Sequence, residues 1–180
     1  MSTISMIMAG FGGQGILFSG KFFAHKGLIE DKYLSWLPSY GPEMRGGTAS
    51  CSVIISDDAV GSPIVSAPDV LVAMNLPSLD KYESTVVPGG LILADSTLIE
   101  RKVMRDDVKV VYIPATRMAG ENGISSLANM IIVGKMLSEL DDFGDAGIEA
   151  ALAKVVSAKR ADMLDANRKA LKLGAEYIGG

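Results

Sequence analysis

The stretch ISMIMAGFGGQGILFSGKFFAHKG, residues 4–27, decides the fold of this chain of 180 residues. It opens with the apolar run 4–9, which stops at a cluster of glycines, as a buried strand does where it enters a tight turn. Apolar residues then recur at helical spacing from Ile16 to Leu28. The stretch therefore predicts a strand, a glycine-rich loop and a helix.

The glycine-rich loop has the spacing of an anion-binding loop. Gly10, Gly12 and Gly15 satisfy G-x-G-x-x-G directly after the predicted strand and at the head of the predicted helix. Glycines permit positive φ angles, and the helix N-terminus offers free N–H groups and a partial positive charge. We interpret Gly10, Gly12, Gly13, Gln14 and Gly15 as candidate binding residues for a phosphate or carboxylate. The alternative is that these glycines only permit a tight turn and close helix packing.

Short apolar runs bounded by turn residues follow along the chain, as in the central strands of an open sheet. They lie at about 33–37, 48–55, 70–74, 91–94 and 108–113. After the turn-forming SDDAVGSP, Ile64 and Val65 are expected to pair back as an antiparallel ribbon. Because strands and helices alternate, the predicted fold is an α/β three-layer sandwich with a mostly parallel, mixed sheet.

The predicted helices alternate with these strands and then continue to the end of the chain. They fall at about 16–28, 77–82, 124–140, 148–157 and 162–177. In the first, Ser19, Lys26 and Glu30 are expected on the polar side, whereas the helix 124–140 is apolar on most sides. Such a helix lies in the core or under another subunit. The sequence indicates one α/β domain, 1–180, with C-terminal helices from about 147.

Composition excludes several classes of function. Hydrophobic residues make up 48% and charged residues 21% of the chain, as in ordinary globular proteins. The net charge is −4 and no stretch concentrates Lys and Arg, so we expect no nucleic-acid partner. The N-terminal MSTISMIMAG has no basic leader and is too short to cross a bilayer. We therefore expect a cytoplasmic protein without membrane contact.

The chain has few side chains for catalysis or metal binding. Cys51 is the only cysteine, which excludes an internal disulfide or a cysteine-ligated cluster, and its place in an apolar run predicts a core residue. His25, the only histidine, lies on the polar side of the first helix, where a solvated residue is expected. We therefore predict no catalytic residue and no metal site in this chain.

A second motif, SYGPEMRGG at residues 39–47, is too rich in proline and glycine for a strand or helix interior. Arg45 can make a bidentate contact to a phosphate or carboxylate, and its neighbouring glycines allow another backbone to approach. We take Ser39, Tyr40, Arg45, Gly46 and Gly47 as candidate binding residues, for coenzyme A phosphates or for a neighbouring subunit. A surface pair of Arg45 with Glu43 is the alternative.

A dinucleotide site requires one more feature, which the sequence lacks. An acidic residue after the second strand usually holds the ribose, yet Glu30 and Asp31 precede that strand and Glu43 is the first carboxylate after it. This weakens an NAD interpretation. Asn75 and Asp95, at the ends of predicted strands, and Thr116, just beyond one, either form a site with the glycine-rich loop or cap turns and helices.

The pair GFGGQG and SYGPEMRGG resembles the gamma subunit of 2-oxoacid:ferredoxin oxidoreductases. The order LVAMN, PGGLILADS, NMIIVGK extends the resemblance, which covers about residues 4–140. It implies a non-catalytic subunit, inactive alone, of a complex that converts a 2-oxoacid and coenzyme A to acyl-CoA, carbon dioxide and reduced ferredoxin.

The resemblance also implies how the cofactors and partners are divided. Thiamine diphosphate and the iron–sulfur clusters belong to other subunits of the complex, namely alpha, beta and a ferredoxin-like delta subunit, and ferredoxin is met only indirectly. Coenzyme A is a candidate ligand of this chain, and 2-oxoglutarate is the favoured substrate on general likeness. Two alternatives stay open: a free-standing NAD- or FAD-binding oxidoreductase, and a pure assembly module that binds no small molecule.

Overall fold

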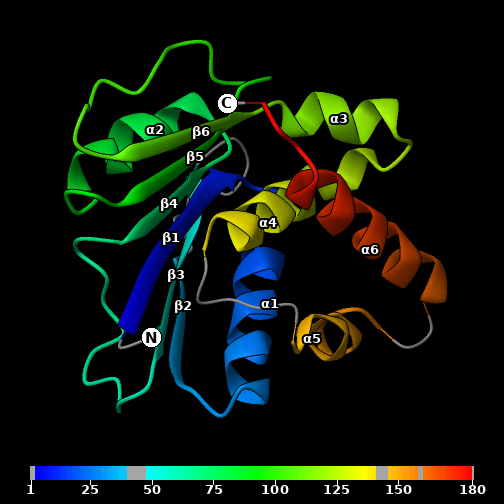
Figure 1. Cartoon of the computed structure of the whole chain (residues 1–180), viewed down its shortest axis with the longest axis horizontal. Coiled ribbons are helices and arrows are strands. Elements are labelled where there is room, and N and C mark those ends of the chain that lie inside the picture. Colours follow the sequence, from blue (N-terminus) through cyan, green and yellow to red (C-terminus); the bar gives the residue numbers. More distant parts are fainter. Residues whose placement is uncertain (1–2, 40–47, 141–145, 158–159, 180) are drawn as a thin grey trace.

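The computed structural model describes residues 3–39, 48–140, 146–157 and 160–179 and is built around a six-stranded sheet (Figure 1). The strands lie in the order β2-β3-β1-β4-β5-β6. Their bounds are β1 Thr3–Phe11, β2 Tyr33–Ser39, β3 Thr48–Ser56, β4 Val70–Ala73, β5 Leu91–Asp95 and β6 Lys109–Ile113.

The sheet is mixed, as predicted, but for a different reason than the sequence indicated. β3 lies between β1 and β2 and is antiparallel to both, whereas β1, β4, β5 and β6 are parallel to one another. The predicted ribbon at Ile64 and Val65 is wrong, because no strand is assigned there and the Ile64 side chain is 72% exposed. Pro63 and Pro68 lack the N–H that a ladder needs.

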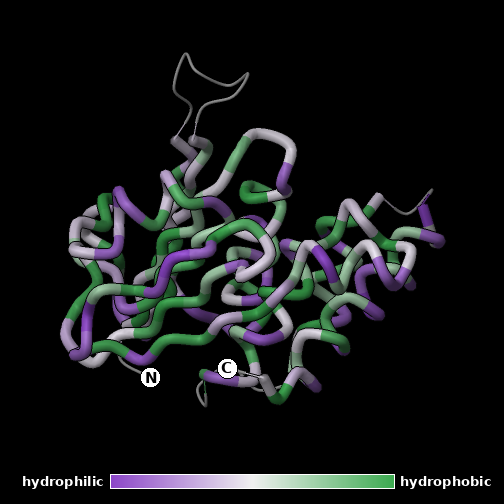
Figure 2. Tube along the Cα trace, turned by 90° about the horizontal axis from the view of Figure 1, so that it is seen from above, coloured by the Kyte–Doolittle hydropathy of each residue, from purple (hydrophilic) through white to green (hydrophobic). Residues whose placement is uncertain are grey.

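Helices cover the two faces of the sheet unequally, giving the three layers (Figure 1). One face packs against α1 and α4, with α5 over α1 and α6 over α4, and the other face packs against α2 and loops. Figure 2 shows alternating hydrophilic and hydrophobic segments along the helices far from the sheet, as amphipathic helices require. The bounds are α1 Ile16–Ile29, α2 Leu76–Tyr82, α3 Ala115–Glu121, α4 Ala128–Glu139, α5 Ile148–Val155 and α6 Ala161–Ala175, with 3-10 turns at Glu83–Thr85 and Ser125–Leu127. In the described ranges no helix is long and apolar enough to cross a membrane.

The predicted polar side of α1 is corrected by the structure. Lys26 is 0% exposed: its Nζ donates to the Ala146 carbonyl oxygen at 2.6 Å and pairs with Glu30. Ser19 is also buried, beside α4. These positions are buried because α5 and α4 cover the side of α1 that turns away from the sheet, a contact that the periodicity of α1 alone cannot show.

The crossing of α4 and α6 brings two backbones into direct contact. A Cβ built on Gly134 would lie 2.0 Å from the Leu171 carbonyl oxygen, and one on Gly174 would lie 1.8 Å from the Ile131 carbonyl oxygen. Real Cβ atoms do not approach so closely, so only glycine fits at either position. The outer helix layer therefore depends on two glycines that the sequence pattern did not single out.

An ion-pair cluster joins β6 to α4. Glu139 accepts from Lys135 of its own helix and from Lys109 of β6, each at 2.6 Å, and these hydrogen bonds hold the pKa of the Glu139 carboxyl below its usual range. A depressed folded-state pKa stabilises the fold above the pKa of the unfolded chain, and this stabilisation is lost as pH falls through the folded-state value.

We expect Glu139→Gln to lower the free energy of unfolding by about 1 kcal/mol at pH 7, since the side chain is only 15% exposed. The difference in stability between parent and variant should disappear as the pH falls through the depressed folded-state pKa of Glu139, where the parent carboxyl becomes protonated. Urea titrations across this pH range measure it. A gap that stays constant with pH would show that the pairs do not stabilise the fold.

Candidate functional site

The carboxyl edge of the sheet brings the glycine-rich loop close to the described residues that border the second motif. The ends of β1, β2, β4, β5 and β6 lie at this edge, and the glycine-rich loop follows β1 there. Phe11, inside the first motif, pairs with Thr48, which follows the second, and Ser39 pairs with Ser50 on the other side of β3. Of the second motif, Ser39 is described; Tyr40, Arg45, Gly46 and Gly47 lie outside the described residues.

Glycine is required at several positions of the loop. Gly13 has φ 92° and Gly15 has φ 76°, both in the left-handed region that glycine enters without strain. A Cβ at Gly10 would lie 2.6 Å from Gln14 Oε1, and one at Gly15 would lie 2.5 Å from Asn129 Nδ2. A Cβ at Gly13 would meet no atom within 4 Å, so its backbone faces open space. The loop thus combines close packing with an accessible backbone at the α1 N-terminus.

Gln14 fixes this loop to the neighbouring strand. Its Oε1 accepts from the Phe11 backbone N–H at 2.6 Å, and its Nε2 donates to the Met74 carbonyl oxygen at 3.1 Å, just beyond the end of β4. Both ends of the amide are therefore used within the loop. A binding role of Gly10, Gly12, Gly13, Gln14 and Gly15 remains a prediction, and in it Gln14 would shape the loop.

The polar residues at and just beyond the strand ends form caps and links. Asp95 is 0% exposed; one carboxylate oxygen accepts from the Thr97 N–H and the other from the Thr116 N–H and hydroxyl. Asn75 Oδ1 accepts from the Ser78 N–H at 2.8 Å and caps α2. These contacts support the capping interpretation, because they position the start of α2 and tie β5 to α3.

Cys51 has the packing role that its sequence context predicts. The thiol is buried in the core beneath α1, and burial raises the pKa of Cys51 to about 12. A thiol in this environment is neither nucleophile nor metal ligand at neutral pH.

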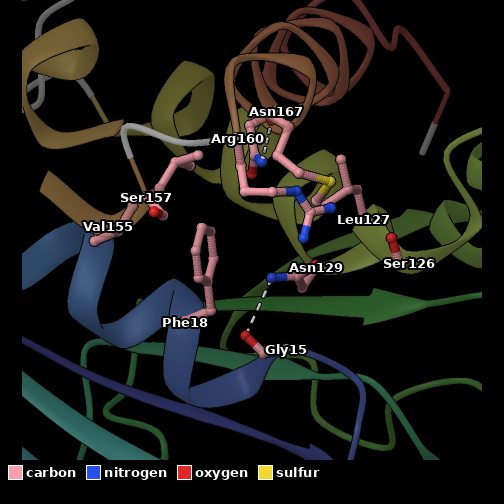
Figure 3. A pocket seen from close by; sticks show the side chains of 11 residues that line it. Gly15, Phe18, Ser126, Leu127, Asn129, Val155, Ser157, Arg160 and Asn167 are labelled. Atoms are coloured by element: carbon pink, nitrogen blue, oxygen red, sulfur yellow. Dashed lines mark hydrogen bonds between the residues drawn. The ribbon is translucent and has the colours of Figure 1, made fainter. Parts of the chain in front are cut away.

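A pocket of about 380 Å³ opens beside Gly15, between α1, α4, α5 and α6 (Figure 3). Phe18, Leu127, Val155 and Met163 give it an apolar wall, and Arg160 reaches into it from the start of α6. The remaining lining residues are Gly15, Ser126, Asn129, Val156, Ser157 and Asn167.

Two buried amides in this pocket have unused acceptors. Asn129 Nδ2 donates to the Gly15 carbonyl oxygen at 3.1 Å and to Ser19 Oγ at 3.0 Å, and Asn167 Nδ2 donates to the Met163 carbonyl oxygen at 2.7 Å. These bonds fix the orientation of both amides. Each Oδ1 is then a buried acceptor without a partner in the described part of the chain. A buried acceptor left unpaired costs about 1–3 kcal/mol, so each oxygen requires a donor from a water or a bound molecule beside the pocket.

The lining defines the chemistry of a fitting ligand. The Arg160 guanidinium favours a phosphate or carboxylate, the two amide oxygens favour N–H or O–H donors, and the apolar wall favours a slender aliphatic part. Sequence reasoning missed Asn129, Asn167 and Arg160, because the first two lie inside ordinary helices and the third precedes one. The NMIIVGK motif was the one available signal, since Asn129 opens it.

Fold and site define a class of protein: an α/β domain whose glycine-rich loop and adjoining pocket lie at the carboxyl edge of the sheet. This is the edge where open α/β sheets bind their ligands. Residues 5–177 match the family described as pyruvate ferredoxin/flavodoxin oxidoreductase. The chain belongs to this family, and the resemblance to gamma subunits that its two motifs indicated is confirmed.

Individual relatives agree with this assignment. The chain is 41% identical to the ketoisovalerate oxidoreductase subunit VorA of Methanothermobacter thermautotrophicus over 94% of its length, but it spans only 35% of that subunit. It is 33% identical to the 2-oxoglutarate synthase subunit KorC of the same organism, covering 95% of this chain and 93% of KorC. The crystal structure of a keto/oxoacid ferredoxin oxidoreductase gamma subunit from Geobacter sulfurreducens superimposes with a TM-score of 0.80 at 29% identity, over 96% of both chains.

Proposed function

We propose that this chain acts as the gamma subunit of a complex that oxidatively decarboxylates a 2-oxoacid with coenzyme A, giving acyl-CoA, carbon dioxide and reduced ferredoxin. Family membership and likeness to a gamma subunit over nearly its whole length support this role. With a single cysteine the chain cannot ligate an iron–sulfur cluster by itself, which agrees with the resemblance. The resemblance implies that the clusters and thiamine diphosphate belong to alpha, beta and ferredoxin-like delta subunits, in the cytoplasm.

The substrate is a 2-oxoacid whose identity the partner subunits determine. The relatives bear the names of two different substrates, ketoisovalerate and 2-oxoglutarate. KorC matches this chain over nearly its full length, whereas VorA extends far beyond it. This favours 2-oxoglutarate, and ketoisovalerate is the alternative to be measured beside it.

Within this role, the glycine-rich loop and the pocket beside it bind coenzyme A. The observation that carries this proposal is the pair of unpaired amide oxygens on Asn129 and Asn167. Coenzyme A offers two amide N–H donors on a slender pantetheine arm, and its phosphates suit Arg160 and the N-terminus of α1. The bound group supplies the thiol that accepts the acyl unit. The residues of this chain would hold and orient it, and Arg45 remains a predicted phosphate ligand from the sequence.

Titration with coenzyme A and NAD tests the ligand. The first acidic residue after β2 is Glu43, so no carboxylate stands at the end of that strand to hold a ribose. We therefore expect coenzyme A to bind at least tenfold more tightly than NAD, a difference in binding free energy of about 1.4 kcal/mol. Calorimetry on the full chain and on the assembled complex measures both affinities. Tighter binding of NAD would favour the free-standing oxidoreductase, and binding of neither would favour a pure assembly module.

Reconstitution tests the role in the complex separately. The purified chain should neither consume 2-oxoglutarate or ketoisovalerate nor reduce a viologen dye, and turnover should appear only when thiamine-dependent partner subunits are added. Substantial activity of the chain alone, in a preparation free of other subunits, would overturn the proposed role.

A further inference from the structure

The edge of the sheet at β2 is open and lies beside a groove. β2 is the last strand in the order, so the N–H and C=O groups along its outer edge have no neighbouring strand in the described chain, although Pro38 offers no N–H. Tyr33 and Leu37, on one face of β2, are 56% and 40% exposed. A groove of about 480 Å³ runs along the other face, between α1, β2 and α5.

Basic side chains line this groove. Lys21 and His25 follow one another at i and i+4 on α1, and Lys154 reaches the groove from α5. Lys21 lies 5.4 Å from the centre of the Trp36 ring, and the described lining residues include no carboxylate. The chain as a whole carries a net charge of −4, so the charge of Lys21 and Lys154 in this groove is opposite in sign to that of the whole molecule.

The position of the cations decides between possible occupants. If a second copy paired through β2 about a two-fold axis, the two grooves would face each other and bring each set of cations against its equivalent. Like charges in such contact oppose association. A negatively charged, extended segment meets both requirements of this edge, because its backbone pairs with β2 and its carboxylates neutralise the groove.

We propose that β2 receives an acidic, extended segment of a partner protein as an added strand. Alternate residues of a strand lie about 6.5–7 Å apart on one face, close to the 5–6 Å between i and i+4 positions of a helix. Acidic residues at alternate positions of the segment therefore have the spacing to contact Lys21 and His25, and a third acidic residue contacts Lys154. Side chains on the opposite face of the segment contact Tyr33 and Leu37. The proposal does not depend on coenzyme A binding.

The probe is a short fluorescein-labelled peptide in which glutamate alternates with threonine. A peptide with glutamine in place of each glutamate is the uncharged control. Fluorescence anisotropy on the full chain should show binding of the acidic peptide, at least about tenfold tighter than that of the glutamine peptide. Double charge reversal, Lys21→Glu with Lys154→Glu, should weaken binding at least about tenfold. The matched control is Lys81→Glu with Lys102→Glu, which makes the same charge change at exposed lysines that lie over the Tyr82 and Tyr112 rings. Its binding should stay within about twofold of the parent.

Strand addition has its own readout. A glutamate peptide N-methylated at alternate residues along one edge loses its pairing groups without changing charge, and it should bind at least about tenfold more weakly. Equal binding of that peptide would overturn strand addition, and equal loss in both charge-reversal variants would overturn the groove as the site. The chain could instead dimerise in a concentration-dependent way, and the double variant Lys21→Glu with Lys154→Glu could dimerise more strongly. That result would assign the edge to a second copy. No binding of the acidic peptide to the folded chain would overturn the proposal outright.

Discussion

Gly174→Ala is expected to lower the free energy of unfolding by about 3 kcal/mol, the upper end of what overpacking usually costs. The new methyl group would be placed 1.8 Å from the Ile131 carbonyl oxygen, and rotation about a side-chain bond can move neither the Cβ nor this backbone oxygen. The two helices must separate instead. Alanine gains about 1 kcal/mol in helix propensity, which offsets only part of the loss.

Gly120→Ala is the matched control for this prediction. Gly120 also lies in a helix, α3, but a Cβ there meets no atom within 4 Å. It should therefore raise stability by about 0.5–1 kcal/mol through propensity alone. Thermal melting separates the two, since 3 kcal/mol corresponds to a drop of roughly 6–12 °C for a domain of this size. Equal melting temperatures would show that α6 can shift along α4 at little cost.

These glycines illustrate which parts of the fold the sequence could predict. The buried strands and the loop at Gly10 to Gly15 were readable, because each is a local pattern of period or spacing. The close approach of Gly134 and Gly174 was not, since it depends on residues about 40 positions apart. The insertion of β3 between β1 and β2, and the short helix α3 at the end of β6, were missed for the same reason: pairing and packing partners decide them.

The candidate site divides along the same line. The loop glycines have conformations that their spacing indicates, with positive φ at Gly13 and Gly15. In the sequence, Lys26 has the pattern of a solvated lysine, but in the structure it is buried where α5 packs on α1. Asn129 and Asn167 have the pattern of ordinary helical residues. A buried unpaired oxygen is a property of three-dimensional surroundings, so the sequence could at most indicate Asn129, through the NMIIVGK motif, and could not indicate the pocket. The residues that carry the coenzyme A proposal are those that only the structure reveals.

Asn167→Leu is expected to change stability and ligand binding in opposite directions. Asn167 is 1% exposed, and its Oδ1 is buried without a partner in the described ranges. Leucine branches at the same carbon and removes this unpaired acceptor, so the free energy of unfolding should rise by about 1 kcal/mol. The lost bond from Nδ2 to the Met163 carbonyl oxygen costs little, because that oxygen lies within the backbone ladder of α6. Coenzyme A should bind about tenfold more weakly, since one of its N–H donors loses its acceptor.

Asn122→Leu is the control for this pair of effects. Asn122 Nδ2 donates to the Met118 carbonyl oxygen four residues earlier, the same local bond, but the side chain does not line the pocket. Its replacement should leave coenzyme A affinity within about twofold of the parent. Urea denaturation and calorimetric titration on the three proteins measure both quantities. A destabilised Asn167→Leu would mean that water already satisfies the amide oxygen, and unchanged coenzyme A affinity would place the coenzyme elsewhere. Higher stability with weaker binding would support the interpretation that the fold keeps an unsatisfied group at this position because the ligand satisfies it.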